Sequence, residues 1–165
     1  MLGPEIVSHL ERSNTMAEIM TAVAKFEAGM RFEGEAGSGQ RMLLDASAYG
    51  GGQNAGFRPM ELLLVGLAGC TGMDVISILR KKRQVVTGYQ VLVQGIRAET
   101  HPMVFEDITV EHIITGQHLD HEAVRRAIEL SEQRYCGAGA MLGKVAKLRH
   151  MYCIVEVETP VLAEA

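Results

Sequence analysis

The longest apolar stretch of the chain, MELLLVGLAGCTGMDVISILRKK at residues 60–82, limits the possible folds more than any other feature. Pro59 precedes it and suits the first turn of a helix, while Glu61 suits the positive N-terminal end. The apolar residues of this predicted helix run nearly all the way round it, so a sheet, a partner helix or a second subunit has to bury most of its faces. Its glycines each cost about 1 kcal/mol relative to alanine, and we expect another backbone to approach closely and offset that cost.

Shorter segments on both sides of this helix alternate in the manner of strands. Before it, residues 21–35 predict a hairpin that turns at Gly29, and RMLLDA predicts a third strand. After it, two long strands are expected to pair antiparallel around a turn at His101-Pro102, followed by a helix that Asp120 caps, a short second helix and a last strand. The expected ranges are 88–100, 104–116, 120–136, 139–148 and 151–158. This order indicates an α+β fold, with no alternating βαβ pattern.

The length of 165 residues and a hydrophobic share of 47% suit one globular domain. Residues 1–15 are polar and weakly helical, so we expect an N-terminal appendage at 1–15 and a single domain at 16–165. The opening residues contain no continuous apolar core, which argues against a secretory signal and a membrane span there. The protein is therefore expected to be cytoplasmic, with no membrane partner.

Charge and motif spacing disfavour several classes of function. A net charge of -4 leaves no broad basic surface for phosphates, so no nucleic acid partner is expected. The glycine-rich loop at 49–56 lacks both the GK[ST] and the GxGxxG patterns of phosphate sites. The histidines show neither i, i+4 nor HExxH spacing, and no CxxC pair occurs, so no metal or other cofactor is expected.

The three cysteines are too few and too far apart for a disulfide scaffold, so any cysteine chemistry would be catalytic or incidental. Cys70 lies about three turns into the long helix, between small residues. Cys136 ends the second amphipathic helix and precedes the small residues of GAGAML. Small neighbours leave a sulfur accessible and a backbone free to adjust, which makes these two cysteines the candidate functional site.

The sequence also supports an expectation for Asp74 and one for Cys153. Asp74 follows Cys70 by four positions on the same helix face, where an unpaired carboxylate would oppose thiolate formation. We therefore expect a basic partner for Asp74. Cys153 alternates with Tyr152 and Ile154 in the last strand and is expected to be a core residue.

Two segments together resemble the cysteine motifs of the OsmC/Ohr family of hydroperoxide reductases. They are RPMELLLVGLAGCTGMDVISILRKKR, which contains Cys70, and LDHEAVRRAIELSEQRYCGAGAMLGKVAKL, which contains Cys136. Their order, their spacing and the flanking strands extend the resemblance over residues 20–158. It implies an OsmC-like fold with antiparallel sheets around a long buried central helix, in an intertwined homodimer whose central helices pack across a two-fold axis.

The resemblance also implies a thiol-dependent peroxidase, an antioxidant enzyme of the oxidative stress response that reduces organic hydroperoxides. Cys70 falls on the peroxidatic position, where its thiolate would attack the O–O bond and become a sulfenic acid. Cys136 falls on the resolving position, where it would condense with that acid into a disulfide. A dithiol of the lipoyl type would restore both thiols, with no cofactor or metal.

The hydroperoxide-specific branch of the family holds its cysteine with an arginine of the first hairpin and a glutamate directly after the helix-opening proline. Met30 and Met60 occupy those positions here, so the chain is more similar to the OsmC-like branch than to the Ohr branch. Arg31 and Glu61, one residue further on, are the candidates for the two roles. A one-residue shift in a strand, however, turns a side chain to the opposite face.

Two other interpretations fit the same residues. The replaced arginine and glutamate would suit a non-enzymatic dimeric module that binds an apolar or thiol-containing small molecule. Alternatively, the cysteines are buried and inert, since a buried cysteine often acts only as a small hydrophobe. A saturable ligand that survives Cys70→Ser would favour the first interpretation. Failure of both native thiols to react with a thiol reagent would favour the second.

Overall fold

The computed structural model describes residues 18–157, so the appendage expected at 1–15 lies outside the described residues. The chain divides into two compact units, one ending at Arg58 and the other beginning at Pro59. Whether the two units act as the single domain expected at 16–165 stays a prediction.

The first unit contains a three-stranded antiparallel sheet in the order β1-β2-β3. Its strands are β1 (Ala22–Ala28), β2 (Arg31–Ala36) and β3 (Arg41–Leu44). Gly29 has a φ of 60° in the turn between β1 and β2, a conformation that glycine adopts without steric cost. The expected hairpin and third strand are both confirmed.

A buried carboxylate organises the loop that follows β3. Asp45 is only 2% exposed and accepts hydrogen bonds from the backbone N–H groups of Ala46, Gln53 and Ala55 at 2.8, 2.9 and 3.0 Å. The hydrogen bonds from Ala55 and Gln53 are the largest causes that lower the pKa of Asp45. The short 3-10 helix η1 (Ala48–Gly50) lies inside this loop. The side chain of Asp45 thus holds the two ends of the glycine-rich loop together before the long helix.

Asp45→Asn is expected to loosen this loop, because an amide oxygen is a weaker acceptor than a carboxylate and the amide nitrogen cannot accept at all. Amide hydrogen exchange at Gln53 and Ala55 should accelerate on the order of tenfold, the loss of about one charge-assisted hydrogen bond. Amides of the second unit serve as the internal control in the same exchange experiment. Unchanged exchange at both loop amides would show that Asp45 does not hold the loop.

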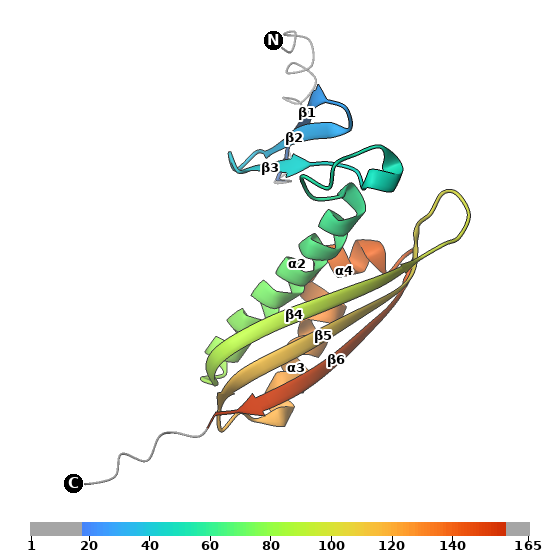
Figure 1. Ribbon diagram of the computed structural model, residues 1–165. Helices are drawn as coiled ribbons and strands as arrows, with labels where there is room; N and C mark the ends of the chain where they lie inside the picture. The colour runs from blue at the N-terminus through green and yellow to red at the C-terminus, as the bar shows by residue number, and fades with distance from the viewer. Residues whose placement is uncertain (1–17, 158–165) are drawn as a thin grey trace, which may run out of the picture. The chain divides into compact units, whose positions relative to one another are not determined.

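The second unit is built on a mixed three-stranded sheet, β4-β5-β6 (Figure 1). β4 (Val85–Arg97) and β5 (Phe105–Gln117) form the expected antiparallel hairpin. β6 (Lys147–Glu156) differs from the expectation of antiparallel sheets, because it runs parallel to β5. A parallel neighbour requires a long crossover connection, and the helical segments between β5 and β6 supply it.

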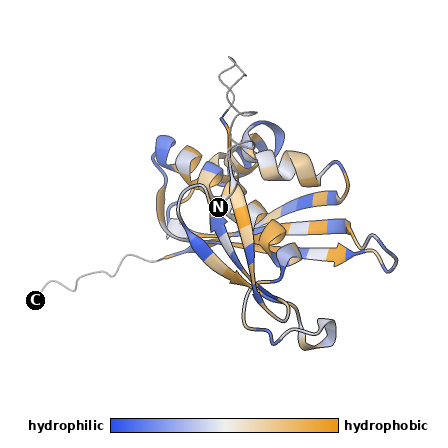
Figure 2. Ribbon diagram, turned by 90° about the horizontal axis from the view of Figure 1, so that it is seen from above, coloured by the Kyte–Doolittle hydropathy of each residue, from blue (hydrophilic) through white to orange (hydrophobic). Residues whose placement is uncertain are grey.

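Those segments are α3 (His121–Leu130), a π-helical turn η2 (Ser131–Tyr135) and α4 (Gly137–Leu142). Asp120 caps α3 as expected, since its side chain accepts a hydrogen bond from the N–H of Glu122 at 2.9 Å. Together with α2 (Pro59–Lys81), these helices lie on one face of the sheet (Figure 1). Alternate residues of the strands therefore enter the core, and the strands change between hydrophobic and hydrophilic from residue to residue (Figure 2).

The long helix α2 buries one stripe and exposes another. Leu67, Thr71, Val75 and Leu79 recur every four residues and are all 0% exposed. The opposite side is exposed and apolar, as at Met73, which is 72% exposed. By length and composition α2 could also cross a membrane, but its buried stripe packs in the core of the second unit. The structure therefore accounts for one face of α2 and leaves an apolar face uncovered in the single chain.

Candidate thiol site

Two different helical segments bring Cys70 and Cys136 together. Cys70 lies in the middle of α2 and is half-buried, beside the fully buried Thr71. Cys136 is 3% exposed and occupies the N-cap of α4, where its Sγ accepts a hydrogen bond from the N–H of Gly139 at 3.2 Å. The Sγ atoms of both cysteines and a carboxylate oxygen of Asp74 all lie within 4.8 Å of one another. The structure therefore brings the two cysteines of the candidate site together, and their function as one site stays a prediction.

A chain of hydroxyl groups orients the carboxylate of Asp74. The Oγ of Ser131 donates to the Oδ2 of Asp74 at 3.0 Å, and the Oγ1 of Thr71 lies 3.0 Å from the same Ser131 Oγ. Because Ser131 uses its proton on Asp74, Thr71 is the donor in the second contact. Ser131 and Thr71 are both fully buried. The prediction of a basic partner for Asp74 is wrong. Within residues 18–157, the hydroxyl group of Ser131 donates to Asp74 and no salt bridge to this carboxylate is formed.

Burial is the largest cause that raises the pKa of Cys136, to about 11. The N–H of Gly139 acts in the opposite direction, while the neighbouring Cys70 thiol and the charge of Asp74 raise the pKa further. Cys136 is therefore a protonated thiol at neutral pH. A protonated, buried thiol is a poor first nucleophile, so direct attack on an external substrate is better suited to the more exposed Cys70.

Apart from Asp74 and the hydroxyl groups of Ser131 and Thr71, the residues that pack with the two cysteines are apolar. Cys136 belongs to a buried hydrophobic cluster with Leu67, Ile108 and Val110, and Cys70 packs against the same cluster together with Met60. Met60 packs against this cluster ten positions before Cys70, which corresponds to roughly 15 Å along α2. Such surroundings favour an organic molecule over a small hydrophilic one.

The two other predicted site residues lie away from this cluster in the chain. Glu61 belongs to α2, nine positions before Cys70, which corresponds to roughly 13 Å along a helix. Arg31 opens β2 in the first unit, where its Nε lies 3.9 Å from a carboxylate oxygen of Glu27. The roles assigned to Glu61 and Arg31 stay predictions.

The prediction of a buried Cys153 is wrong, because this residue is exposed. Its neighbours Tyr152 and Ile154 face the helices, where the ring of Tyr152 contacts His121 and Ile154 packs on the core. In a strand, the intervening side chain points to the other face. Cys153 therefore provides an exposed thiol away from the candidate site, a useful control.

Sequence reasoning did not identify Ser131 and Thr71 as parts of the site. The signal for Ser131 was present, since a serine falls on the apolar stripe of α3 together with Val124 and Ile128. Tyr135 has the same spacing, four positions after Ser131, yet it is 51% exposed. The π-helical turn η2 explains the difference, because its wider turn rotates the residues after Ser131 off the helical stripe.

A second polar chain lies on the helix-covered side of the second sheet. The Oη of Tyr89 lies 2.6 Å from the Nδ1 of His112, whose Nε2 lies 3.0 Å from the Nδ1 of His150. His112 is 0% exposed, and burial, with the charge of His150 as the smaller cause, lowers its pKa to about 4. Burial also lowers the pKa of His150 and raises that of Tyr89. At neutral pH all three groups are uncharged, so this chain is a structural network of neutral hydrogen bonds.

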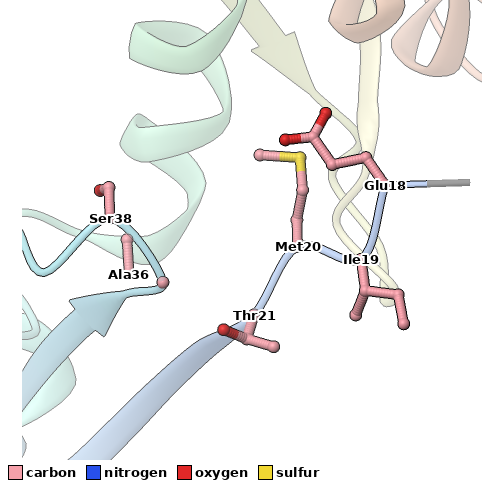
Figure 3. Close-up of a pocket in the computed structure, with 7 residues that line it drawn as sticks. Glu18, Ile19, Met20, Thr21, Ala36 and Ser38 are labelled. Atoms are coloured by element: carbon pink, nitrogen blue, oxygen red, sulfur yellow. The ribbon is translucent and has the colours of Figure 1, made fainter. Parts of the chain in front are cut away.

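A surface concavity of about 380 Å³ in the first unit is not a candidate site. Residues 18–21 and 36–38 line it, and Figure 3 shows Glu18 and Met20 on one side and Ala36 and Ser38 on the other. Glu18 is the one ionisable group in this lining, and no thiol or imidazole is present among the described lining residues. Glu18 therefore has no nucleophilic thiol or imidazole beside it among these lining residues.

The fold and the thiol site define the class of protein as a small α+β protein with two neighbouring cysteines. The long helix α2 carries Cys70, and Cys136 lies at the start of the short helix α4. A family model described as OsmC-like protein matches residues 50–151, and the chain belongs to this family. Protein YhfA of Escherichia coli (strain K12) is 38% identical over 136 residues, which cover 82% of this chain and 98% of YhfA.

Solved structures agree with this assignment. A hypothetical protein from Aquifex aeolicus VF5 is 28% identical, with a TM-score of 0.76 over 86% of this chain and 100% of that one. The organic hydroperoxide resistance protein OhrB of Bacillus subtilis is 16% identical, with a TM-score of 0.57 over 82% of this chain and 98% of that one. At that identity the likeness shows the fold alone. The expected OsmC-like α+β fold is confirmed.

Proposed function

We propose that this protein is a thiol-dependent peroxidase that reduces organic hydroperoxides through Cys70 and Cys136. The observation that carries the proposal is the placement of both sulfurs within 4.8 Å of one another inside an apolar cluster. Closing a disulfide, whose S–S length is about 2.05 Å, then requires the sulfurs to approach by less than about 3 Å. Fold relatives named organic hydroperoxide resistance proteins are consistent with this chemistry.

The proposed cycle balances in three steps. The thiolate of Cys70 attacks the terminal oxygen of the hydroperoxide ROOH, the O–O bond breaks, and ROH leaves after taking a proton from solvent, so Cys70 becomes a sulfenic acid. The thiol of Cys136 then attacks the sulfur of that acid, which forms the disulfide and releases water. An external dithiol of the lipoyl type reduces the disulfide and is itself oxidised to a disulfide. The half-buried Cys70 is the first nucleophile and the buried Cys136 the second.

We further propose that the working form is a cytoplasmic homodimer. The exposed face of α2 supports this, because Leu63, Val65 and Met73 are 45%, 53% and 72% exposed on a helix of the core. A Cβ atom added at Gly66 would meet nothing within 4 Å in the described chain, so a second copy could approach this face closely. Burying that face between two subunits would remove an apolar patch from water.

The experiment that tests the thiol cycle is mass spectrometry of the intact reduced protein after one equivalent of cumene hydroperoxide, with hydrogen peroxide for comparison. The expected result is the loss of two hydrogen atoms, with a peptide in which Cys70 is linked to Cys136, and faster reaction with the organic peroxide. Cys153→Ser should react in the same way, because the exposed Cys153 takes no part. Unmodified thiols at Cys70 and Cys136 would contradict the proposal.

A non-enzymatic binding module is the second candidate function. The presence of Met30 and Met60 at the positions of the family's arginine and glutamate favours it. Saturable binding of an apolar thiol, measured by calorimetry and retained in Cys70→Ser, would support this alternative. Binding that disappears with the Cys70 sulfur would instead support the peroxidase.

A further inference from the structure

We propose that the reduced protein binds one Zn²⁺ ion through Cys70, Asp74 and Cys136. Two thiolates and a carboxylate are ligand types that zinc accepts, at about 2.3 Å for sulfur and about 2.0–2.2 Å for oxygen. In a tetrahedral site, such ligand atoms lie roughly 3.4–3.8 Å from one another. The three ligand atoms here lie within 4.8 Å of one another, so side-chain movements on the order of 1 Å would complete the site.

The three ligands come from a helical pair and one distant residue. Cys70 and Asp74 are four positions apart on α2, which places both side chains on the same helix face. Cys136 reaches the pair from the N-cap of α4. These three ligands match neither the CxxC nor the HExxH pattern. For that reason the sequence predicted no metal site.

Hydrogen bonds outside the ligand set orient two of the three ligands. Ser131 donates to the Oδ2 of Asp74 and is itself held by Thr71, so one carboxylate oxygen is fixed while the other stays available for a metal. The N–H of Gly139 donates to the Sγ of Cys136, a contact that stabilises a thiolate as well as a thiol. Metal sites commonly depend on such supporting contacts, whose loss costs about 10–100-fold in affinity.

Binding is written as Zn²⁺ plus two thiols giving a zinc dithiolate plus two protons, with the carboxylate of Asp74 as the third ligand and water as the fourth. Sulfur is not oxidised in this step, so no electron acceptor is needed. The inference does not depend on the proposed peroxidase function, because it requires only reduced thiols. If both functions exist, they exclude one another, since a coordinated thiolate and a disulfide cannot share the same sulfur atoms.

The test uses the full chain in its reduced form, titrated with Zn²⁺ in competition with a chromogenic chelator and with Co²⁺ as a spectroscopic probe. We expect one ion per chain and, with Co²⁺, a near-ultraviolet thiolate-to-metal absorption together with the visible bands of a tetrahedral ion. Protein oxidised to the Cys70–Cys136 disulfide should bind neither ion. A reduced protein without the thiolate absorption would overturn the proposal.

Variants separate the ligands from their surroundings. Cys70→Ser and Asp74→Asn should each weaken Zn²⁺ binding at least about tenfold, and Ser131→Ala on the order of tenfold. Cys153→Ser is the matched control, because it removes a thiol that lies on the exposed face of β6. Circular dichroism checks that each variant is folded, and Asp74→Asn retains both thiols if a cysteine variant does not fold. Unchanged affinity in Asp74→Asn and Cys70→Ser, or loss of binding in Cys153→Ser, would place the ion elsewhere and overturn the assignment.

Discussion

Cys70→Ser is expected to reduce the turnover of cumene hydroperoxide at least about a thousandfold, to the level of the uncatalysed reaction with the dithiol. A serine hydroxyl cannot replace the thiolate, because it is not ionised at neutral pH and forms no stable oxidised state that a second thiol can reduce. The assay is the steady-state loss of hydroperoxide in the presence of dihydrolipoamide. Wild-type protein and Cys153→Ser should show the same rate, since Cys153 is exposed and lies outside the thiol cluster.

Cys136→Ser distinguishes the first step of the cycle from the second. This variant should still consume about one equivalent of hydroperoxide, because Cys70 can form its sulfenic acid without a partner, but disulfide formation should disappear. Trapping with dimedone should then label Cys70. Turnover by Cys70→Ser above a tenth of the wild-type rate would show that Cys70 is not the peroxidatic residue, whereas an inactive wild type would reject the proposed function itself.

The main helix and most strands could be predicted because local signals and tertiary packing agree there. Residues 60–82 are too apolar and too long for a strand or a loop, and α2 covers Pro59–Lys81. Gly29 and the His101-Pro102 turn mark the two hairpins, which the structure confirms. The parallel pairing of β6 with β5 has no comparable local signal, because it depends on how the intervening helices return the chain to the sheet.

The thiol site could be predicted only in part. Small neighbours drew attention to Cys70 and Cys136, and the family resemblance paired them, but spacing alone could not place residues 66 positions apart within 4.8 Å. The hydrogen-bond partner of Asp74 could not be predicted for the same reason, since Ser131 belongs to another helical segment far along the chain. The strand alternation that placed Tyr152 and Ile154 inside should have placed Cys153 outside, and only the residue type argued for burial.

The buried His112 and the half-buried His150 predict a marked pH dependence of stability, because Tyr89, His112 and His150 form one neutral hydrogen-bonded chain. The Nε2 of His150 is buried without a hydrogen-bond partner among the described residues, so the chain has no acceptor there for an additional proton. Glu132 is the nearby charged group, and it raises the pKa of His150 while burial lowers that pKa more strongly. Protonation therefore places a charge in the core that Glu132 compensates only in part.

The direction of the effect follows from proton binding. The pKa of His112 is about 4 in the folded protein and 6.5 in its ordinary state, so between these values the unfolded chain binds one proton more than the folded chain. The free energy of unfolding should be greatest above pH 6.5 and should fall as the pH is lowered towards 4. The loss from His112 alone amounts to roughly 3 kcal/mol at about 1.4 kcal/mol per pH unit.

Urea unfolding at several pH values between 4.5 and 7 tests this directly, with the matched variants His112→Phe and His101→Gln. His112→Phe should be less stable at neutral pH, because Tyr89 and His150 lose their shared partner, yet its stability should depend less steeply on pH by about one proton. His101→Gln changes an exposed histidine and should keep the wild-type slope. Parallel slopes for wild type and His112→Phe would mean that His112 has the same pKa in the folded and the unfolded chain, which its complete burial beside a second imidazole makes energetically costly.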